Sequence, residues 1–153
     1  MGRLFAAIDH IAIALWAGGL WVVGYLVAPL LFLKAPDRQI AGNLAGQMFA
    51  AMAFVGIACA LYVLIFRLAR LGLPAMKQAL FWVALLMAVL AAAGHFGVQP
   101  ILASLKAQAL PREVMESVLR DRFATWHGVA SVLYLIESVL AVALVLLAAR
   151  SPR

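Results

Sequence analysis

The feature that most constrains this chain is its first apolar stretch, which covers residues 5–33. Apart from Asp9 and His10 near its start, the only titratable side chain in this stretch is that of Tyr25. A helix that crosses a bilayer needs about 20 mostly apolar residues, and this stretch is longer than that. The sequence therefore predicts a transmembrane helix that tilts or bends, and Pro29 is expected to kink its last turns.

Three more apolar runs follow the first, and the composition agrees with a lipid environment. Hydrophobic residues make up 67% of the 153 residues, and charged residues make up 12%. A soluble domain of this size could not cover so much apolar surface, so we expect the lipid bilayer to be the main partner. The predicted spans are residues 5–33, 40–66, 78–105 and 123–149, within one domain of residues 1–153.

Short connections join these runs, so consecutive helices are expected to be antiparallel neighbours. The predicted fold class is therefore all-α: an integral membrane four-helix bundle of up-down-up-down topology. Pro111 is expected to open a short amphipathic helix over residues 112–122, at the membrane interface before the fourth span. Both ends of the chain would then lie on one side of the membrane.

The formal net charge of +6 does not point to a nucleic-acid partner. The basic residues form no dense patch and lie at the ends of apolar runs, where they would meet lipid headgroups and water. Lys and Arg divide equally between the two sides of the predicted bundle. The denser short loop at residues 67–77 favours cytoplasmic termini.

Polar side chains gather in the half of the predicted bundle that is far from the termini. The second run opens with Gln39, Asn43 and Gln47, whose spacing of four residues places them on one helical face. Gly42 and Gly46 lie beside them at a spacing suited to close helix contact. If the helical faces converge, the polar cluster comprises Asn43, Gln47, His95, Gln99, His127 and Ser131. The simpler alternative is that the histidines bond at the interface and the amides join neighbouring helices.

Glu137 lies ten residues beyond His127, or about 15 Å deeper in the membrane, with Tyr134 one turn away. An ionisable group near the midplane is a functional-site candidate, because burying it unpaired is costly. No Lys or Arg lies inside the four predicted spans. We therefore expect Glu137 to be neutral, or to be paired within the bundle without a salt bridge. The alternative is a purely structural hydrogen bond to a carbonyl or to Tyr134.

Three separated stretches resemble a bacterial four-span membrane family of unknown function, within the copper-resistance-D-like superfamily. They are HIAIALWAGGLWVVGYLVAPLLF, AGNLAGQMF and RFATWHGVASVLYLIESVL. The resemblance covers nearly the whole chain and implies a multi-pass protein of the bacterial inner membrane. It implies no established activity. The superfamily suggests metal handling, but the chain has no His and Met cluster of the kind that Cu(I) prefers, and we assign no metal ligands.

A more distant resemblance is to the HemJ-type protoporphyrinogen oxidases. His10 precedes the WAGG stretch at residues 16–19, and Lys77 opens the third run. The resemblance implies His10 and Lys77 as a haem-associated pair, with haem b as the cofactor. The chain departs from that family because the His that usually accompanies the Lys is absent.

If a haem is bound by two histidines instead, His95 and His127 form the sterically simpler pair, because they lie at one depth on consecutive helices. The sequence thus leaves several functions open. The protein either binds or handles a small ligand or metal, supports a membrane complex as a subunit or homo-oligomer, or acts as a haem-dependent oxidoreductase. The sequence does not decide whether the protein is an enzyme.

Overall fold

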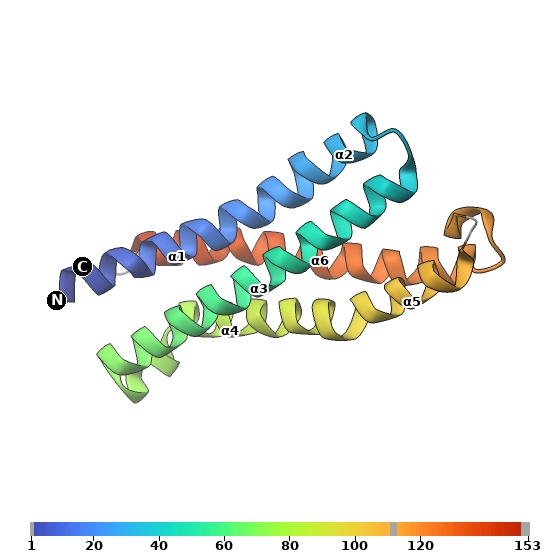
Figure 1. The fold of residues 1–153 in the computed structure, drawn as a ribbon. Coiled ribbons are helices and arrows are strands. Elements are labelled where there is room, and N and C mark those ends of the chain that lie inside the picture. The colour runs from blue at the N-terminus through green and yellow to red at the C-terminus, as the bar shows by residue number, and fades with distance from the viewer. Residues whose placement is uncertain (1, 111–112, 151–153) are drawn as a thin grey trace.

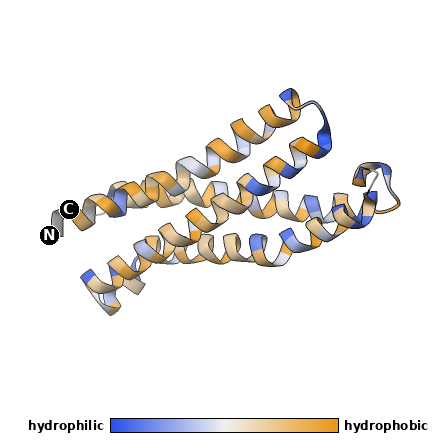
Figure 2. Cartoon of the chain, in the orientation of Figure 1, coloured by the Kyte–Doolittle hydropathy of each residue, from blue (hydrophilic) through white to orange (hydrophobic). Residues whose placement is uncertain are grey.

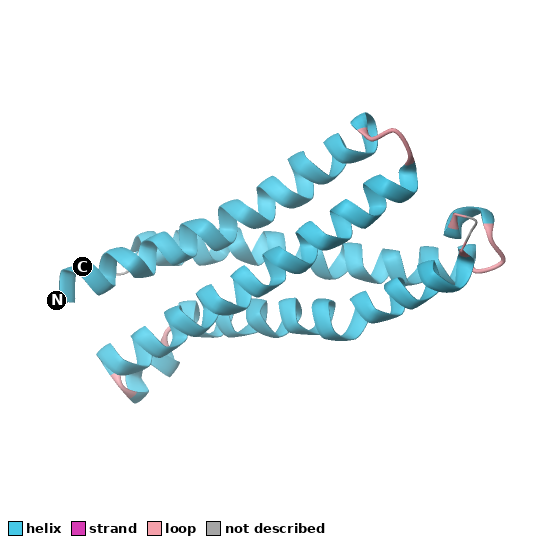
Figure 3. Cartoon of the chain, viewed as in Figure 1, coloured by secondary structure: helices cyan, strands magenta, loops and turns pink. Residues whose placement is uncertain are grey.

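The computed structural model describes residues 2–110 and 113–150, and these residues are helical outside a few turns (Figures 1 and 3). The elements are α1 (Gly2–Val22), the π-helix η1 (Val23–Val27), α2 (Ala28–Lys34), α3 (Arg38–Leu71), the 3-10 helix η2 (Leu73–Lys77), α4 (Ala79–Ala92), the π-helix η3 (Ala93–Val98), α5 (Gln99–Ala109), the 3-10 helix η4 (Val114–Glu116) and α6 (Arg120–Arg150).

Four helical segments are long and apolar enough to cross a membrane, which confirms the predicted fold class of four long apolar helices. They are Ala7–Lys34, Arg38–Leu71, Ala79–Ala109 and Arg120–Arg150. The first combines α1, η1 and α2, and the third combines α4, η3 and α5. Hydrophobic residues dominate the helices, and hydrophilic residues concentrate at the turns and in one half of the bundle (Figure 2).

The four spans form the predicted up-down-up-down bundle, and α1 begins at the end where α6 finishes (Figure 1). In this terminal half the helices pack as a closed ring, since α1 contacts α3 and α6, and α4 contacts the same two helices. The core lies here, and its largest fully buried side chains are Trp16, Met87, Leu144 and Val63.

Glycines allow the close approach of α1 to its neighbours. A Cβ atom at Gly56 would lie 2.6 Å from Nε1 of Trp16, and one at Gly19 would lie 2.6 Å from the sulfur of Met52. Small residues serve the same purpose in other membrane bundles, where backbones must come close for van der Waals contact. The Trp16 indole therefore fits against the α3 backbone only because residue 56 lacks a side chain.

The other half of the bundle is open. Here α2 packs against α3, and α5 packs against α6, but these two hairpins make no extensive contact with each other. Figure 1 shows the α2–α3 hairpin diverging from the α5–α6 hairpin. The bundle is thus closed at its terminal end and split at the opposite end.

Both π-helices lie where this split begins, and each precedes a proline. The Ala28 amide donates to the Val23 carbonyl, and the Gln99 amide donates to the Gly94 carbonyl, so each turn is one residue wider than an α-turn. Pro29 and Pro100 follow directly, near the start of α2 and α5. A proline ring clashes with the carbonyl four residues earlier, and a widened turn relieves that clash. Pro29 thus perturbs its helix as expected, but by widening the preceding turn.

The short helical element before the last span is one 3-10 turn, Val114–Glu116, rather than a helix over residues 112–122. Ser117 ends it in an extended conformation, because its hydroxyl donates to the Val114 carbonyl and accepts from the Leu119 amide. Such local side-chain bonds compete with helix formation. Pro111, which was expected to open the element, lies outside the described residues.

Candidate functional site

A cleft lies between the two hairpins, in the open half of the bundle. It consists of an inner cavity of about 550 Å³ and an outer cavity of about 1120 Å³. The two cavities share the lining residues Phe32, His95, Gln99, Leu102 and His127. The inner cavity reaches towards the closed core, and the outer cavity opens at the far end of the bundle. Clefts of this size that bind small molecules are common in proteins.

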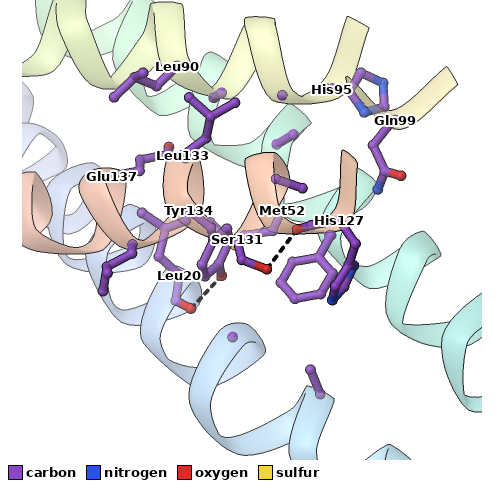
Figure 4. A pocket seen from close by; sticks show the side chains of 18 of the residues that line it. Leu20, Met52, Leu90, His95, Gln99, His127, Ser131, Leu133, Tyr134 and Glu137 are labelled. Carbon is purple, nitrogen blue, oxygen red and sulfur yellow. Dashed lines mark hydrogen bonds between the residues drawn. The ribbon is translucent and has the colours of Figure 1, made fainter. Parts of the chain in front are cut away.

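The inner cavity is mainly apolar and has a few polar groups along its length. Figure 4 shows Glu137 at one end, His95, Gln99 and His127 at the other, and Ser131 and Tyr134 between them. Apolar side chains such as Leu20, Met52, Leu90 and Leu133 complete the wall (Figure 4). A few polar groups in an apolar wall are the usual means of orienting a small ligand.

Glu137 is the deepest polar group of the cleft, and only 6% of the residue is exposed. The Trp16 indole lies close enough to interact with the carboxyl, but neither Nε1 of Trp16 nor Oε1 of Glu137 makes a hydrogen bond of acceptable geometry. Among the described residues no Lys or Arg pairs with it. A buried polar atom without a partner is costly, so the Glu137 carboxyl can accept a further polar contact.

Tyr134 and Ser131 are both engaged by backbone groups. The Tyr134 hydroxyl donates to the Leu20 carbonyl at 2.6 Å, and the Ser131 hydroxyl donates to the His127 carbonyl at 2.8 Å (Figure 4). Gly24 in η1 leaves the space that the Tyr134 ring occupies. Tyr134 therefore ties α6 to α1 and shapes the cavity wall.

The two histidines of the cleft lie against aromatic rings. His95 packs edge-on against Phe54 and Phe96, with ring centroids 4.5 and 4.8 Å apart, and its buried Nδ1 has no hydrogen-bond partner. The ring of His127 stacks on Phe123 at 5.8 Å. Both side chains line the inner and the outer cavity. The cleft therefore brings together the two histidines that the sequence analysis expected at the same depth in the membrane.

The outer cavity contains the remaining members of the expected polar cluster. Asn43 and Gln47 on α3 line it together with His95, Gln99 and His127. Gly42 and Gly46, by contrast, are not at a close helix contact. A Cβ atom at Gly46 would meet no other atom within 4 Å, because the cleft separates α3 from α5 at this level.

Two long side chains from α5 bridge the cleft to α3. The Lys106 ammonium donates to the Gly42 carbonyl at 3.0 Å, and the Gln99 amide donates to the Gly46 carbonyl at 3.5 Å. Lys106 also lies 6.0 Å from the centroid of the Phe123 ring. Sequence reasoning missed Lys106 because it follows directly on the predicted third span and was assigned to the headgroup region.

His10 and Lys77, the pair implied by the HemJ resemblance, do not line this cleft. His10 is on an exposed part of α1, and Lys77 is an exposed residue at the end of η2. Both belong to the terminal half, away from the cleft. Among the described residues, no group of three or more His, Cys, Asp or Glu side chains is arranged to bind a metal ion.

The terminal half contains a buried ion pair that the sequence did not reveal. The Arg67 guanidinium lies 2.9 Å from the Asp9 carboxylate and also donates to the Gln78 side chain at 3.3 Å. Arg67 was expected in the loop after the second span, but α3 continues to Leu71 and ends at Gly72, whose φ of 64° suits glycine. The longer helix brings Arg67 inside the bundle.

The fold and its apolar surface define a multi-pass membrane protein with four transmembrane helices. The chain belongs to the family described as domain of unknown function (DUF4149), whose profile matches residues 11–111. No curated protein and no solved structure matches the chain. The matched residues include the second and third spans, which supply Asn43, Gln47, His95 and Gln99, and they stop before α6.

Proposed function

We propose that this protein binds a small, largely apolar ligand inside the membrane, in the cleft between its two hairpins. The observation that supports the proposal is the cleft itself, which splits an otherwise closed bundle and is continuous from Glu137 to the outer cavity. A helix pair in lipid gains nothing from leaving such a space, since packing contacts are the main force that joins membrane helices. The polar groups that line it are the ligand-orienting residues of the proposed site: Asn43, Gln47, His95, Gln99, His127, Ser131, Tyr134 and Glu137.

Two glycines of η3 provide a matched test. Gly94 lines the inner cavity and Gly97 does not, and a Cβ atom at either position would meet no other atom within 4 Å. Gly94→Leu should therefore fill part of the cavity, whereas Gly97→Leu adds the same side chain to the same π-helix outside it.

Native mass spectrometry of protein extracted in mild detergent measures the outcome. We expect a noncovalent bound mass at fixed stoichiometry in the wild type and in Gly97→Leu, and its loss in Gly94→Leu. Equal retention in both variants, or no bound mass in the wild type, would refute the proposal.

A second candidate is a haem-binding oxidoreductase, which is favoured by the presence of His95 and His127 in one cleft. These two residues fit the role of haem ligands, because imidazole is a common axial ligand and Nδ1 of His95 has no other partner. A haem bound there would supply one-electron chemistry. His10 and Lys77 do not fit a site in this cleft.

The absorption spectrum of the purified protein tests the second candidate. A Soret band that disappears in both His95→Ala and His127→Ala would support it. A band that is lost only in His10→Ala would reject this histidine pair in favour of the HemJ-like arrangement.

We further propose that the protein resides in the bacterial inner membrane with cytoplasmic termini, and that its family belongs to the copper-resistance-D-like superfamily. The first part rests on the family resemblance and on the dense basic loop at residues 67–77. The second part rests on the three resembling stretches alone.

A further inference from the structure

The mouth of the cleft carries two cationic side chains that form no ion pair with a described carboxylate. Arg38 and Lys106 line the outer cavity, and among the described residues that line it Glu113 is the only acidic one. Among the described residues the one ion pair is that of Asp9 and Arg67, at the other end of the bundle. Arg38 and Lys106 thus face the cleft without a carboxylate partner.

Of the two cations, Lys106 is the one that a bound anion would stabilise more. It is half-buried, and its ammonium bonds to the carbonyl of Gly42 inside α3, a neutral acceptor. An ionised oxygen attracts an ammonium group more strongly than a neutral carbonyl does, because the Coulomb attraction of opposite charges adds to the hydrogen bond. An anionic oxygen that entered the outer cavity would therefore be a better partner for Lys106 than this carbonyl.

The space behind the two cations is apolar and long. On α6 the inner cavity extends from His127 to Glu137, which corresponds to about 15 Å at 1.5 Å per residue. Its wall includes Phe49, Met52, Leu90 and Leu133. A water-soluble anion would leave this space unused, whereas the acyl chain of a lipid would occupy it.

We infer that the ligand of the proposed cleft is an anionic phospholipid. Its phosphate group is bound by Lys106 and Arg38 at the mouth, and one of its acyl chains lies in the inner cavity. Basic pockets between transmembrane helices recognise anionic lipid headgroups in this way. The inference rests on the proposed function, because it identifies the occupant of the same cleft.

Delipidated protein, titrated with dioleoylphosphatidylglycerol or dioleoylphosphatidylcholine and followed by native mass spectrometry, tests the inference. Both lipids carry a phosphate, but the choline cation of phosphatidylcholine offsets its attraction to Lys106 and Arg38. The wild type should therefore bind the phosphatidylglycerol about tenfold more tightly, which corresponds to about 1.4 kcal/mol. Lys106→Gln and Arg38→Gln should each remove most of this preference, and Lys106→Arg should retain it. Lys34→Gln is the matched control, since Lys34 ends α2 at the same end of the bundle but does not line the cleft.

The experiment distinguishes failure of the phospholipid inference from failure of the proposed ligand-binding function. If both lipids bind the wild type equally and Gly94→Leu weakens both, the cleft binds lipid and the headgroup inference is wrong. If Lys34→Gln removes the preference as fully as Lys106→Gln does, general surface charge explains it, and the inference is also wrong. If soluble glycerol phosphate competes as effectively as the phosphatidylglycerol, the acyl chain contributes nothing and the lipid assignment fails.

Discussion

Arg67 on α3 donates a hydrogen bond of 2.9 Å to the carboxylate of Asp9 on α1, and the two residues are only 7% and 2% exposed. The pair joins the first two spans within the closed half of the bundle. Neither group is completely satisfied, because Oδ1 of Asp9 and Nε of Arg67 have no hydrogen-bond partner. The pair is thus sensitive to the loss of either member.

We expect Asp9→Ala to destabilise the protein by about 3–5 kcal/mol, because it leaves the Arg67 charge buried without compensation. The double variant Asp9→Leu/Arg67→Met should recover most of this loss, since apolar side chains often replace a buried ion pair without cost. Thermal unfolding in detergent, followed by tryptophan fluorescence, measures both. A double variant that is less stable than Asp9→Ala would contradict the prediction.

Gly56 should tolerate no side chain. Gly56→Ala places a Cβ atom 2.6 Å from the fully buried Trp16 ring, and such overpacking typically costs about 1–3 kcal/mol. Gly46→Ala is the control on the same helix, because its Cβ atom would meet open space. Alanine favours helix over glycine, so the control should keep or slightly raise the melting temperature. Equal melting temperatures for the two variants would show that Trp16 moves freely to make room.

Tyr134→Phe removes the hydroxyl that donates to the Leu20 carbonyl. Hydrogen bonds between membrane helices contribute about 0.6 kcal/mol on average, so we expect a small decrease in stability. Tyr25→Phe serves as the control, since Tyr25 also lines the inner cavity and is exposed. A larger loss of stability for Tyr25→Phe than for Tyr134→Phe would run against the assigned role of the hydroxyl.

The topology predicts where reporter domains will be found. A reporter fused at Gly72 should lie on the same side of the membrane as one fused beyond Arg150. Reporters fused at Ala35 and Ala109 should lie on the opposite side, because each follows an odd number of spans. Paired phosphatase and fluorescent-protein fusions give this readout, and any other pattern would exclude the four-span arrangement.

The spans could be predicted from the sequence because each is a long apolar run, and apolar length alone decides whether a helix can cross a bilayer. The positions of His95 and His127 along their spans also predicted that the two histidines lie at the same depth in the membrane. The end of α3 could not be predicted, because the basic residues after Phe66 are equally compatible with a loop at the headgroups. The helix ends at Gly72, which has a φ of 64° and whose amide donates to the Leu68 carbonyl. The sequence also could not show that Arg67 pairs with Asp9, because this is a contact between two helices.

The cleft could not be predicted from the sequence either, because it too depends on how separate helices are arranged. Gly42 and Gly46 have the spacing of a close helix contact, yet a Cβ atom at Gly46 would meet open space and one at Gly42 would meet only the ends of two side chains, Lys106 and Phe32. The reason is that the two hairpins diverge beyond the π-helices. That divergence depends on how η1 and η3 widen their helices before Pro29 and Pro100. Widening of this kind leaves no periodic signal in the sequence. The composition of residues 112–122 likewise favours an amphipathic helix. The hydrogen bonds of the Ser117 side chain instead end the helical turn after Glu116.

Because one end of the bundle is closed and the other is split, the cleft is accessible from only one of the two membrane leaflets. A compound dissolved in the leaflet around the terminal half meets a sealed ring of helices, while the same compound in the opposite leaflet meets the mouth of the cleft. In vesicles where the protein inserts in both orientations, a lipid supplied to the outer leaflet would load only the molecules whose split end faces outward. The rest would fill at the rate of lipid flip-flop, so the loading curve would have a fast and a slow phase.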